Sequence, residues 1–174
     1  MLFRSTYKSL LKKDLYLFEG NDPSALIQEL EIAISSGQKA ILHTDGQKHK
    51  SNWGTRNLEH YLKKKYQNIK ILRIDSESVS DRTHPAYGCM GNINRILPDY
   101  DLVICSPVIE TGVSIDCNHF DAVFAISHGV QSIDSFAQAL ARIRSGVPRY
   151  IWVSEYSPNR IGNRSEEHTS ELQS

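Results

Sequence analysis

Two arginines and a glutamine near the end of the chain are the residues best suited to chemistry. Gln138 and Arg142 are four positions apart, so they share one face of a predicted helix. Arg144 lies about 200° further around that helix, and it joins Arg142 only if the helix unwinds near Ser145 and Gly146. Two planar, permanently charged guanidinium groups side by side would suit a polyphosphate. Taken alone, however, arginines on a helix face are usually solvated or in surface ion pairs.

Three polar loops follow apolar runs that are typical of buried strands. They span residues 44–47, 106–116 and 127–131. In an open parallel sheet, ligands bind beyond the carboxyl ends of the strands. We therefore expect these loops at a binding edge, and the last of them leads into the helix that carries the arginines.

The elements around these loops follow the pattern of an α/β fold. Helices are predicted at 22–36, 52–66 and 131–145. Residues 1–20 are ambiguous, because LYLFEG could be an edge strand or a joint to an upstream lobe. Apolar runs predict five strands, at 39–44, 69–74, 101–106, 120–127 and 149–154. Such alternation indicates a mainly parallel sheet with helices on both faces.

Two segments of the chain, 83–99 and 131–145, differ in how clearly their sequence predicts a helix. The stretch 83–99 shows no clear element beyond a helical turn or two at 92–97. The helix at 131–145 has an apolar stripe at helical spacing that is predicted to face the core. The stripe consists of Ile133, Phe136, Ala137, Leu140 and Ala141.

Composition indicates a soluble globular protein. The chain has 174 residues, 40% of them hydrophobic and 23% charged, which is enough for one domain with a core and excludes a disordered tail. Neither a bilayer-spanning run nor a secretory signal is present, so no membrane contact and a cytoplasmic location are expected. The three cysteines have neither disulfide-like nor zinc-like spacing, so no metal site is expected.

The last eleven residues look foreign to the protein. Residues 164–174, RSEEHTSELQS, resemble a translated sequencing adapter, so we exclude them from the analysis of the fold. They carry one arginine and three glutamates, so the net charge changes from zero to +2 without them. We expect a joint or edge element from an upstream lobe at 1–20, one domain at 21–156 and the start of a continuation at 157–163.

Three motifs, taken in order, resemble those of a known enzyme family. LHTDGQ, SPVIETGVSID and QALARIR resemble motifs IV, V and VI of superfamily-two helicases. The sequence looks most like herpes-type origin-binding helicases and the replication proteins of cyanobacterial plasmids, over most of residues 38–155. The resemblance implies a RecA-like second lobe, a three-layer α/β sandwich, in an ATP-dependent DNA helicase for plasmid or origin replication.

The resemblance also implies roles for single residues. Arg142 and Arg144 would reach the phosphates of a nucleotide across a cleft, one of them as an arginine finger. The family's commoner spacing places the second arginine where this chain has Ser145, so the choice of finger stays open. Residues implied at the nucleotide are Gln138, Gly112 and Asp116. Residues implied at the backbone of single-stranded DNA are Thr44, Asp45, Ser106 and Thr111.

The parts that hold a nucleotide triphosphate are missing from the sequence. It contains no Gly-x-x-x-x-Gly-Lys-Ser/Thr loop and no acidic magnesium box after a strand. ATP and Mg²⁺ would then be held mainly by the first RecA-like lobe of the same protein. We expect the chain alone to hydrolyse no ATP.

Two other functions fit the same residues. The first is a non-catalytic RecA-like or Rossmann-like binding module, in which the arginines are structural. The second is the translocase lobe of a nuclease or restriction system, which only neighbouring domains would distinguish. The sequence leaves open the preference for DNA or RNA, the polarity of translocation and the oligomeric state.

Overall fold

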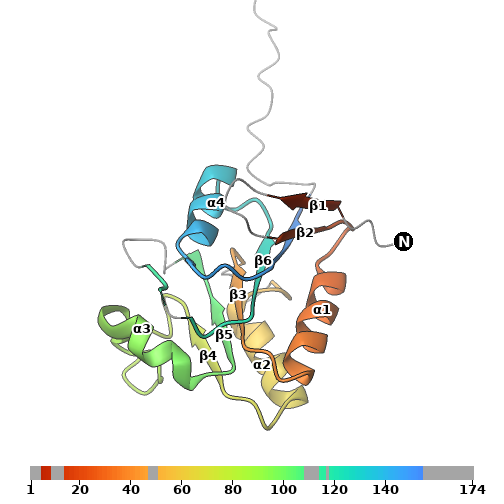
Figure 1. Cartoon of the computed structure of the whole chain (residues 1–174). Helices are drawn as coiled ribbons and strands as arrows, with labels where there is room; N and C mark the ends of the chain where they lie inside the picture. Colours follow the sequence, from red (N-terminus) through yellow and green to blue (C-terminus); the bar gives the residue numbers. More distant parts are fainter. Residues whose placement is uncertain (1–4, 9–13, 47–50, 108–113, 117, 155–174) are drawn as a thin grey trace, which may run out of the picture.

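The chain forms a seven-stranded sheet within the part described by the computed structural model, which covers residues 5–8, 14–46, 51–107, 114–116 and 118–154 (Figure 1). The strand order is β1-β2-β7-β6-β3-β5-β4. The strands are β1 (Ser5–Lys8), β2 (Asp14–Phe18), β3 (Ala40–Thr44), β4 (Ile71–Ile74), β5 (Leu102–Cys105), β6 (Ala122–Ser127) and β7 (Arg149–Val153). All neighbouring pairs are parallel except β1 and β2, which are antiparallel.

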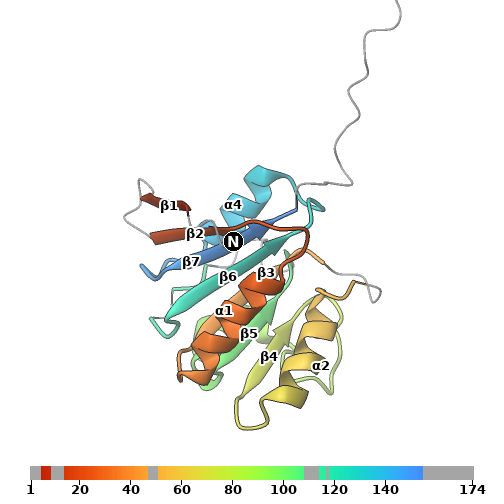
Figure 2. The same cartoon turned by 90° about the vertical axis from the view of Figure 1, so that its right-hand side faces the viewer.

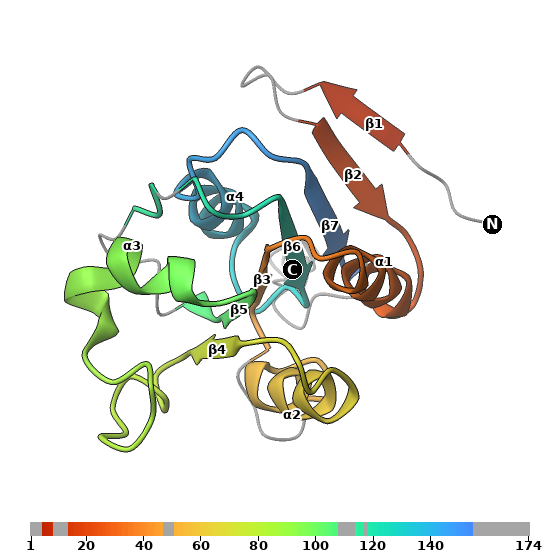
Figure 3. The same cartoon turned by 60° about the horizontal axis from the view of Figure 1, so that its bottom comes forward.

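Helices cover both faces of the sheet (Figures 2 and 3). One face carries α1 (Ser24–Ser35) and α2 (Thr55–Lys65). The other carries α4 (Ile133–Ala141) and α3 (Ile93–Ile96), which is flanked by the short 3-10 turns Cys89–Asn92 and Leu97–Asp99. Each face has its own core of buried apolar side chains. The molecule is therefore a three-layer α/β sandwich with a mainly parallel sheet, as the sequence predicts.

Local sequence explains where the elements begin and end. Strands β3 to β6 are buried along their whole length, which fits their near-continuous apolar runs. Before α1, the Asp22 carboxylate accepts the backbone N–H of Ser24 at 2.9 Å. After α1, Gly37 has φ +84°, a left-handed conformation that glycine adopts without strain. Both helix ends fall within about two residues of the predicted bounds.

The sheet is larger than predicted, because two strands near the N-terminus add to the expected five. LYLFEG contributes β2, so the segment is a strand, but it lies between β1 and β7 and is not the expected edge strand. Strand β1 was not predicted, and its sequence STYK has no alternation of apolar and polar residues. The helical turn expected at 92–97 is confirmed as α3.

Helix α4 is shorter and faces the sheet differently from the prediction. It ends at Ala141 rather than near Ser145. Of the predicted apolar stripe, Phe136 and Leu140 are buried, whereas Ile133 is 80% exposed. Ala137 and Ala141 are also exposed. The helix is turned so that its buried face continues to Ile143 beyond its end.

Among the described residues, the helices are all too short or too polar to cross a membrane.

Candidate functional site

The segment after α4 pairs with the segment after the β5 loop. The backbone N–H of Ile115 donates to the carbonyl oxygen of Arg142 at 3.0 Å. The backbone N–H of Arg144 donates to the carbonyl oxygen of Ile115 at 3.1 Å. Helix α4 stops at Ala141 and the chain continues as an isolated β-bridge, so Arg144 is no longer carried round the helix. The structure thus brings together two segments that the sequence analysis singled out separately.

An exposed ion pair joins the side chains of the two segments. Arg144 Nε lies 3.3 Å from Asp116 Oδ1, and the side chains are 70% and 51% exposed, respectively. The Ser114 hydroxyl donates to the same Asp116 oxygen at 3.1 Å. A pair this exposed contributes little to stability, about 1 kcal/mol or less. In this structure the pair turns the Arg144 guanidinium toward Asp116.

Arg142 has a buried donor for which the described residues supply no acceptor. Its Nη1 atom is buried and has no hydrogen-bond partner among the described residues, although the residue as a whole is only partly buried. Gln138, one helical turn earlier, is exposed. A buried donor without an acceptor is unfavourable. An anion or a neighbouring lobe that supplies an acceptor to Arg142 would remove this cost.

The side chain of Asn94 in α3 makes hydrogen bonds to the 114–116 segment, which also pairs with Arg142 and Arg144. Its Nδ2 donates to the carbonyl oxygen of Ser114 at 2.9 Å, and its Oδ1 accepts the backbone N–H of Asp116 at 2.9 Å. Sequence analysis missed Asn94, because its partners lie 20 and 22 residues further along the chain.

Arg149 also supports this region, and sequence analysis missed it too. It lies at the start of β7 and is buried, and its guanidinium donates to the carbonyl oxygens of Leu140, Ile143, Ser145 and Val147. These carbonyls belong to the end of α4 and the segment that follows it, where cations are favoured. Burial lowers the pKa of Arg149 from its ordinary value. The sequence did offer one indication of this role, because Arg149 is a charged residue at the start of an apolar run that predicts a strand.

At the carboxyl edge of the sheet, Asp45 fastens the loop that follows β6. Asp45 is completely buried. Its carboxylate accepts the backbone N–H of His128 at 2.8 Å, that of Val130 at 3.2 Å and the Ser127 hydroxyl at 3.1 Å. The His128 ring Nδ1 lies 3.2 Å from the same carboxylate. Burial alone would raise the pKa of Asp45, but the hydrogen bonds from His128 and Ser127 outweigh it and lower this pKa.

Thr44 and Ser106 are buried at the same edge. The Thr44 hydroxyl donates to the carbonyl oxygen of Trp53 at 2.9 Å and accepts the backbone N–H of Gly46. Ser106 donates its backbone N–H to the carbonyl oxygen of Ile74 at 3.0 Å. Thr44, Asp45 and Ser106 therefore face the interior in this structure, which differs from the expectation that their side chains face a nucleic-acid backbone.

Several predicted features lie outside the described residues. Thr111 and Gly112 belong to the loop 108–113, and the segments 157–163 and 164–174 are likewise outside. Within the described part of the chain, no three His, Cys, Asp or Glu side chains gather as they would around a metal ion.

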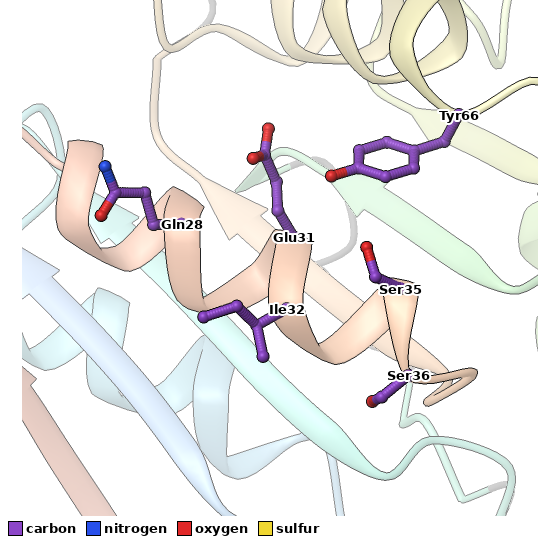
Figure 4. Close-up of a pocket in the computed structure, with 6 residues that line it drawn as sticks. All are labelled: Gln28, Glu31, Ile32, Ser35, Ser36 and Tyr66. Atoms are coloured by element: carbon purple, nitrogen blue, oxygen red, sulfur yellow. The ribbon is translucent and has the colours of Figure 1, made fainter.

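A separate groove lies between α1 and α2, on the face of the sheet opposite to the arginines (Figure 4). Its volume is about 580 Å³. The lining residues are Gln28, Glu31, Ile32, Ser35, Ser36 and Tyr66. The one carboxylate in it, that of Glu31, already accepts hydrogen bonds from Tyr61 and Lys65 at 2.6 and 2.7 Å. The charged group of this groove is thus already paired within the chain.

Known proteins that resemble this chain include a relative that is itself uncharacterised and two distantly similar structures. No family model matches the chain. An uncharacterised protein of Picosynechococcus sp. is 49% identical over 164 residues; the match covers 91% of this chain and 16% of that protein. The chain thus spans about a sixth of the length of its relative.

Both solved structures are ATPase or helicase domains. The C-terminal part of the Fun30 ATPase domain is 18% identical, with a TM-score of 0.48, over 77% of this chain and 41% of that one. The Pyrococcus furiosus Hef helicase domain is 13% identical, with a TM-score of 0.39, over 75% of this chain and 24% of that one. With TM-scores below 0.5, neither likeness is evidence for the function of this chain.

Proposed function

We propose that this chain is the second RecA-like lobe of a superfamily-two DNA helicase that acts in plasmid or origin replication. Arg142 and Arg144 contact the phosphates of ATP, which a first lobe outside this chain holds together with Mg²⁺. The observation that carries the proposal is the backbone pairing of Ile115 with Arg142 and Arg144. This pairing joins the segments that resemble motifs V and VI, which is the arrangement that a shared nucleotide site requires.

The two arginines differ in what they offer to a nucleotide. Arg142 has a buried donor without a partner among the described residues, so a phosphate oxygen would satisfy it. Arg144 is held by Asp116 and is mostly exposed. We therefore assign the arginine finger to Arg142, which would stabilise the charge that develops on the transferred phosphoryl group. Arg144, with Gln138, Gly112 and Asp116, lines the nucleotide.

Single-stranded DNA is assigned to the carboxyl edge of the sheet. Parallel strands β3, β5 and β6 end at this edge. Hydroxyls and backbone N–H groups of loops at such an edge bind phosphates without reading sequence. Thr111 belongs to the loop after β5. Thr44, Asp45 and Ser106 are buried, so their part in this contact is to shape the loops rather than to touch the strand.

Kinetics of the full-length protein test the proposal. DNA-stimulated ATP hydrolysis would be measured for Arg142→Ala and Arg144→Ala, with ATP binding measured separately. Arg56→Ala is the matched control, because Arg56 is an exposed arginine on α2, on the opposite face of the sheet. We expect Arg142→Ala to lower kcat about 1,000-fold, a typical effect of removing an arginine finger, while ATP still binds.

The opposite result has a clear meaning. If both variants keep the kcat of the wild-type protein and of Arg56→Ala, the arginines are structural charges. The exposed pair of Arg144 with Asp116 is the observation that favours this second function, a non-catalytic binding module.

The DNA that flanks the coding sequence gives a test independent of kinetics. The proposal expects a phosphate-binding loop and an acidic magnesium box in frame upstream. The relative, of which this chain spans only 16%, has room for both. A continuous gene without either motif would contradict the first-lobe part of the proposal.

A further inference from the structure

We propose that Asn94 is a positioning residue for the arginine pair: it holds the 114–116 segment against which Arg142 and Arg144 are paired. This inference rests on the proposed function. Asn94 lies on α3, outside the segments that resemble helicase motifs. It would touch neither nucleotide nor DNA, and it would act through the residues that it fixes.

The geometry is that of a short strand bonded on both edges. On one edge, the Asn94 amide nitrogen donates to the carbonyl oxygen of Ser114. The Asn94 amide oxygen accepts the backbone N–H of Asp116, and both bonds are 2.9 Å long. On the other edge, Ile115 exchanges its N–H and carbonyl with Arg142 and Arg144. An asparagine side chain carries both a donor and an acceptor, so it can bond residues i and i+2 as a neighbouring strand would.

The position of the Arg144 guanidinium depends on this arrangement. Asn94 fixes the backbone of Asp116, and the Asp116 carboxylate lies 3.3 Å from Arg144 Nε. The 142–144 backbone is fixed through Ile115. Without the Asn94 amide, the 114–116 segment would keep, among its bonds to described residues, those that Ile115 makes with Arg142 and Arg144. The side chains of this segment, and the arginines paired with it, would then sample more orientations. When catalysis depends on orientation, a displacement of a catalytic group by about 1 Å lowers the rate about 100-fold.

Asn94 is suited to a test because truncation of its side chain leaves the buried residues that attach α3 to the core unchanged. The Asn94 side chain is on the surface, whereas its neighbours Ile93 and Leu97 are buried in the core. Asn92 is a matched control, since it is an exposed asparagine two residues earlier whose side chain makes no capping bond to the helix. Replacement of either residue should leave the fold intact.

The experiment uses the full-length protein and ATP. For Asn94→Ala we expect kcat to fall at least about tenfold, with KM for ATP changed less than about threefold, while Asn92→Ala behaves as wild type. Asn94→Asp keeps the acceptor but loses the donor to Ser114, so its kcat should also fall. In a background of Arg142→Ala and Arg144→Ala, Asn94→Ala should lower kcat no further, because a positioning residue has no effect without the groups it positions.

Each outcome decides between the two proposals. If the arginine variants lower kcat but Asn94→Ala and Asn94→Asp do not, the positioning role is wrong and the proposed function stands. If Asn94→Ala lowers kcat equally with and without the arginines, Asn94 acts elsewhere, and the inference is also overturned. If the arginine variants have no effect, the proposed function itself fails. Should Asn94→Ala not fold, Asn94→Asp, which has the same size, carries the same comparison.

Discussion

Asp45 and His128, 83 residues apart in the chain, are joined by a hydrogen bond from the backbone N–H of His128 to Asp45 Oδ1 at 2.8 Å. The bond ties the end of β3 to the loop that leads from β6 into α4. Asp45 is completely buried, so its charge is balanced by the N–H and O–H donors of this loop. The bond therefore belongs to the framework that holds α4 and the arginines after it.

The first prediction concerns removal of that charge. In Asp45→Asn, the N–H and O–H donors that bond the carboxylate would face either an NH₂ group, which cannot accept, or a neutral oxygen, which is a weaker acceptor. We expect the free energy of unfolding to fall by about 2 kcal/mol, since hydrogen bonds to charged groups are worth about 1.5–3 kcal/mol. Urea denaturation of the chain measures the change. Asp14→Asn, at the exposed start of β2, is the control and should leave stability within about 0.5 kcal/mol. Equal effects of the two substitutions would contradict this assignment.

The second prediction concerns acid. The pKa values of Asp45 and Asp75 both lie below the ordinary value of 3.8. In each case burial opposes the shift; at Asp75 it is outweighed by hydrogen bonds from Thr55 and Ser78 and by the charge of Arg73. Because the folded pKa is the lower one, the stabilisation is fully present above pH 3.8 and is lost as the pH falls through the folded pKa.

Thermal unfolding from pH 7 to pH 2 tests this sign. We expect Tm to fall steeply below about pH 4 in the wild-type chain and less steeply in Asp45→Asn, which has one fewer group to protonate. If Tm falls equally steeply with falling pH in the two proteins, Asp45 has an ordinary pKa in the folded state.

The third prediction concerns Arg149. Its buried guanidinium bonds four carbonyl oxygens, and only a planar fork can serve them together. We expect Arg149→Lys to lower the free energy of unfolding by about 2–4 kcal/mol, because the carbonyls lose donors and a compact charge stays buried. Arg144→Lys, at a 70% exposed arginine, should change it by less than about 1 kcal/mol. Denaturant unfolding of both variants provides the comparison.

A fourth prediction separates the two sides of α4. Leu140 is buried and Ile133 is 80% exposed, although both belong to the apolar stripe predicted from the sequence. Leu140→Ala should therefore cost about 2–5 kcal/mol of stability, whereas Ile133→Ser should cost less than about 0.5 kcal/mol in this chain. A large loss in Ile133→Ser would mean that Ile133 is buried in solution, and that the helix faces the sheet as the sequence predicts.

The error about α4 shows what the sequence alone can supply. Periodicity correctly predicts that Phe136 and Leu140 face the core, and apolar runs correctly predict β3 to β7. The end of the helix was wrong because Ile143 is drawn into a bridge with Ile115, 28 residues earlier in the chain. No local pattern encodes such a partner.

The candidate site was predictable in part for the same reason. Residue types pointed to Arg142 and Arg144, and the resemblance to helicase motifs added Asp116. The structure brings these three residues together. The resemblance implied that Asp45 faces a nucleic-acid backbone. Asp45 is buried instead, because donors from residues 127–130 reach its carboxylate. Asn94 carried no signal, since an asparagine in a polar stretch is recognisable as a support only once its partners are placed beside it.

The fifth prediction is that the purified chain does not hydrolyse ATP. Guanidinium groups stabilise charge that develops during phosphoryl transfer, but the reaction also needs a loop that cradles the β- and γ-phosphates and a carboxylate that holds Mg²⁺. The sequence contains neither motif. We expect phosphate release from ATP and Mg²⁺ to be the same for the wild-type chain, for Arg142→Ala and for buffer, with or without single-stranded DNA. Turnover by the wild-type chain that disappears in Arg142→Ala would show that the chain holds a complete site, and the division of labour between two lobes would then be wrong. Turnover that survives in Arg142→Ala would instead indicate a contaminating ATPase, which a repeat with separately purified protein would identify.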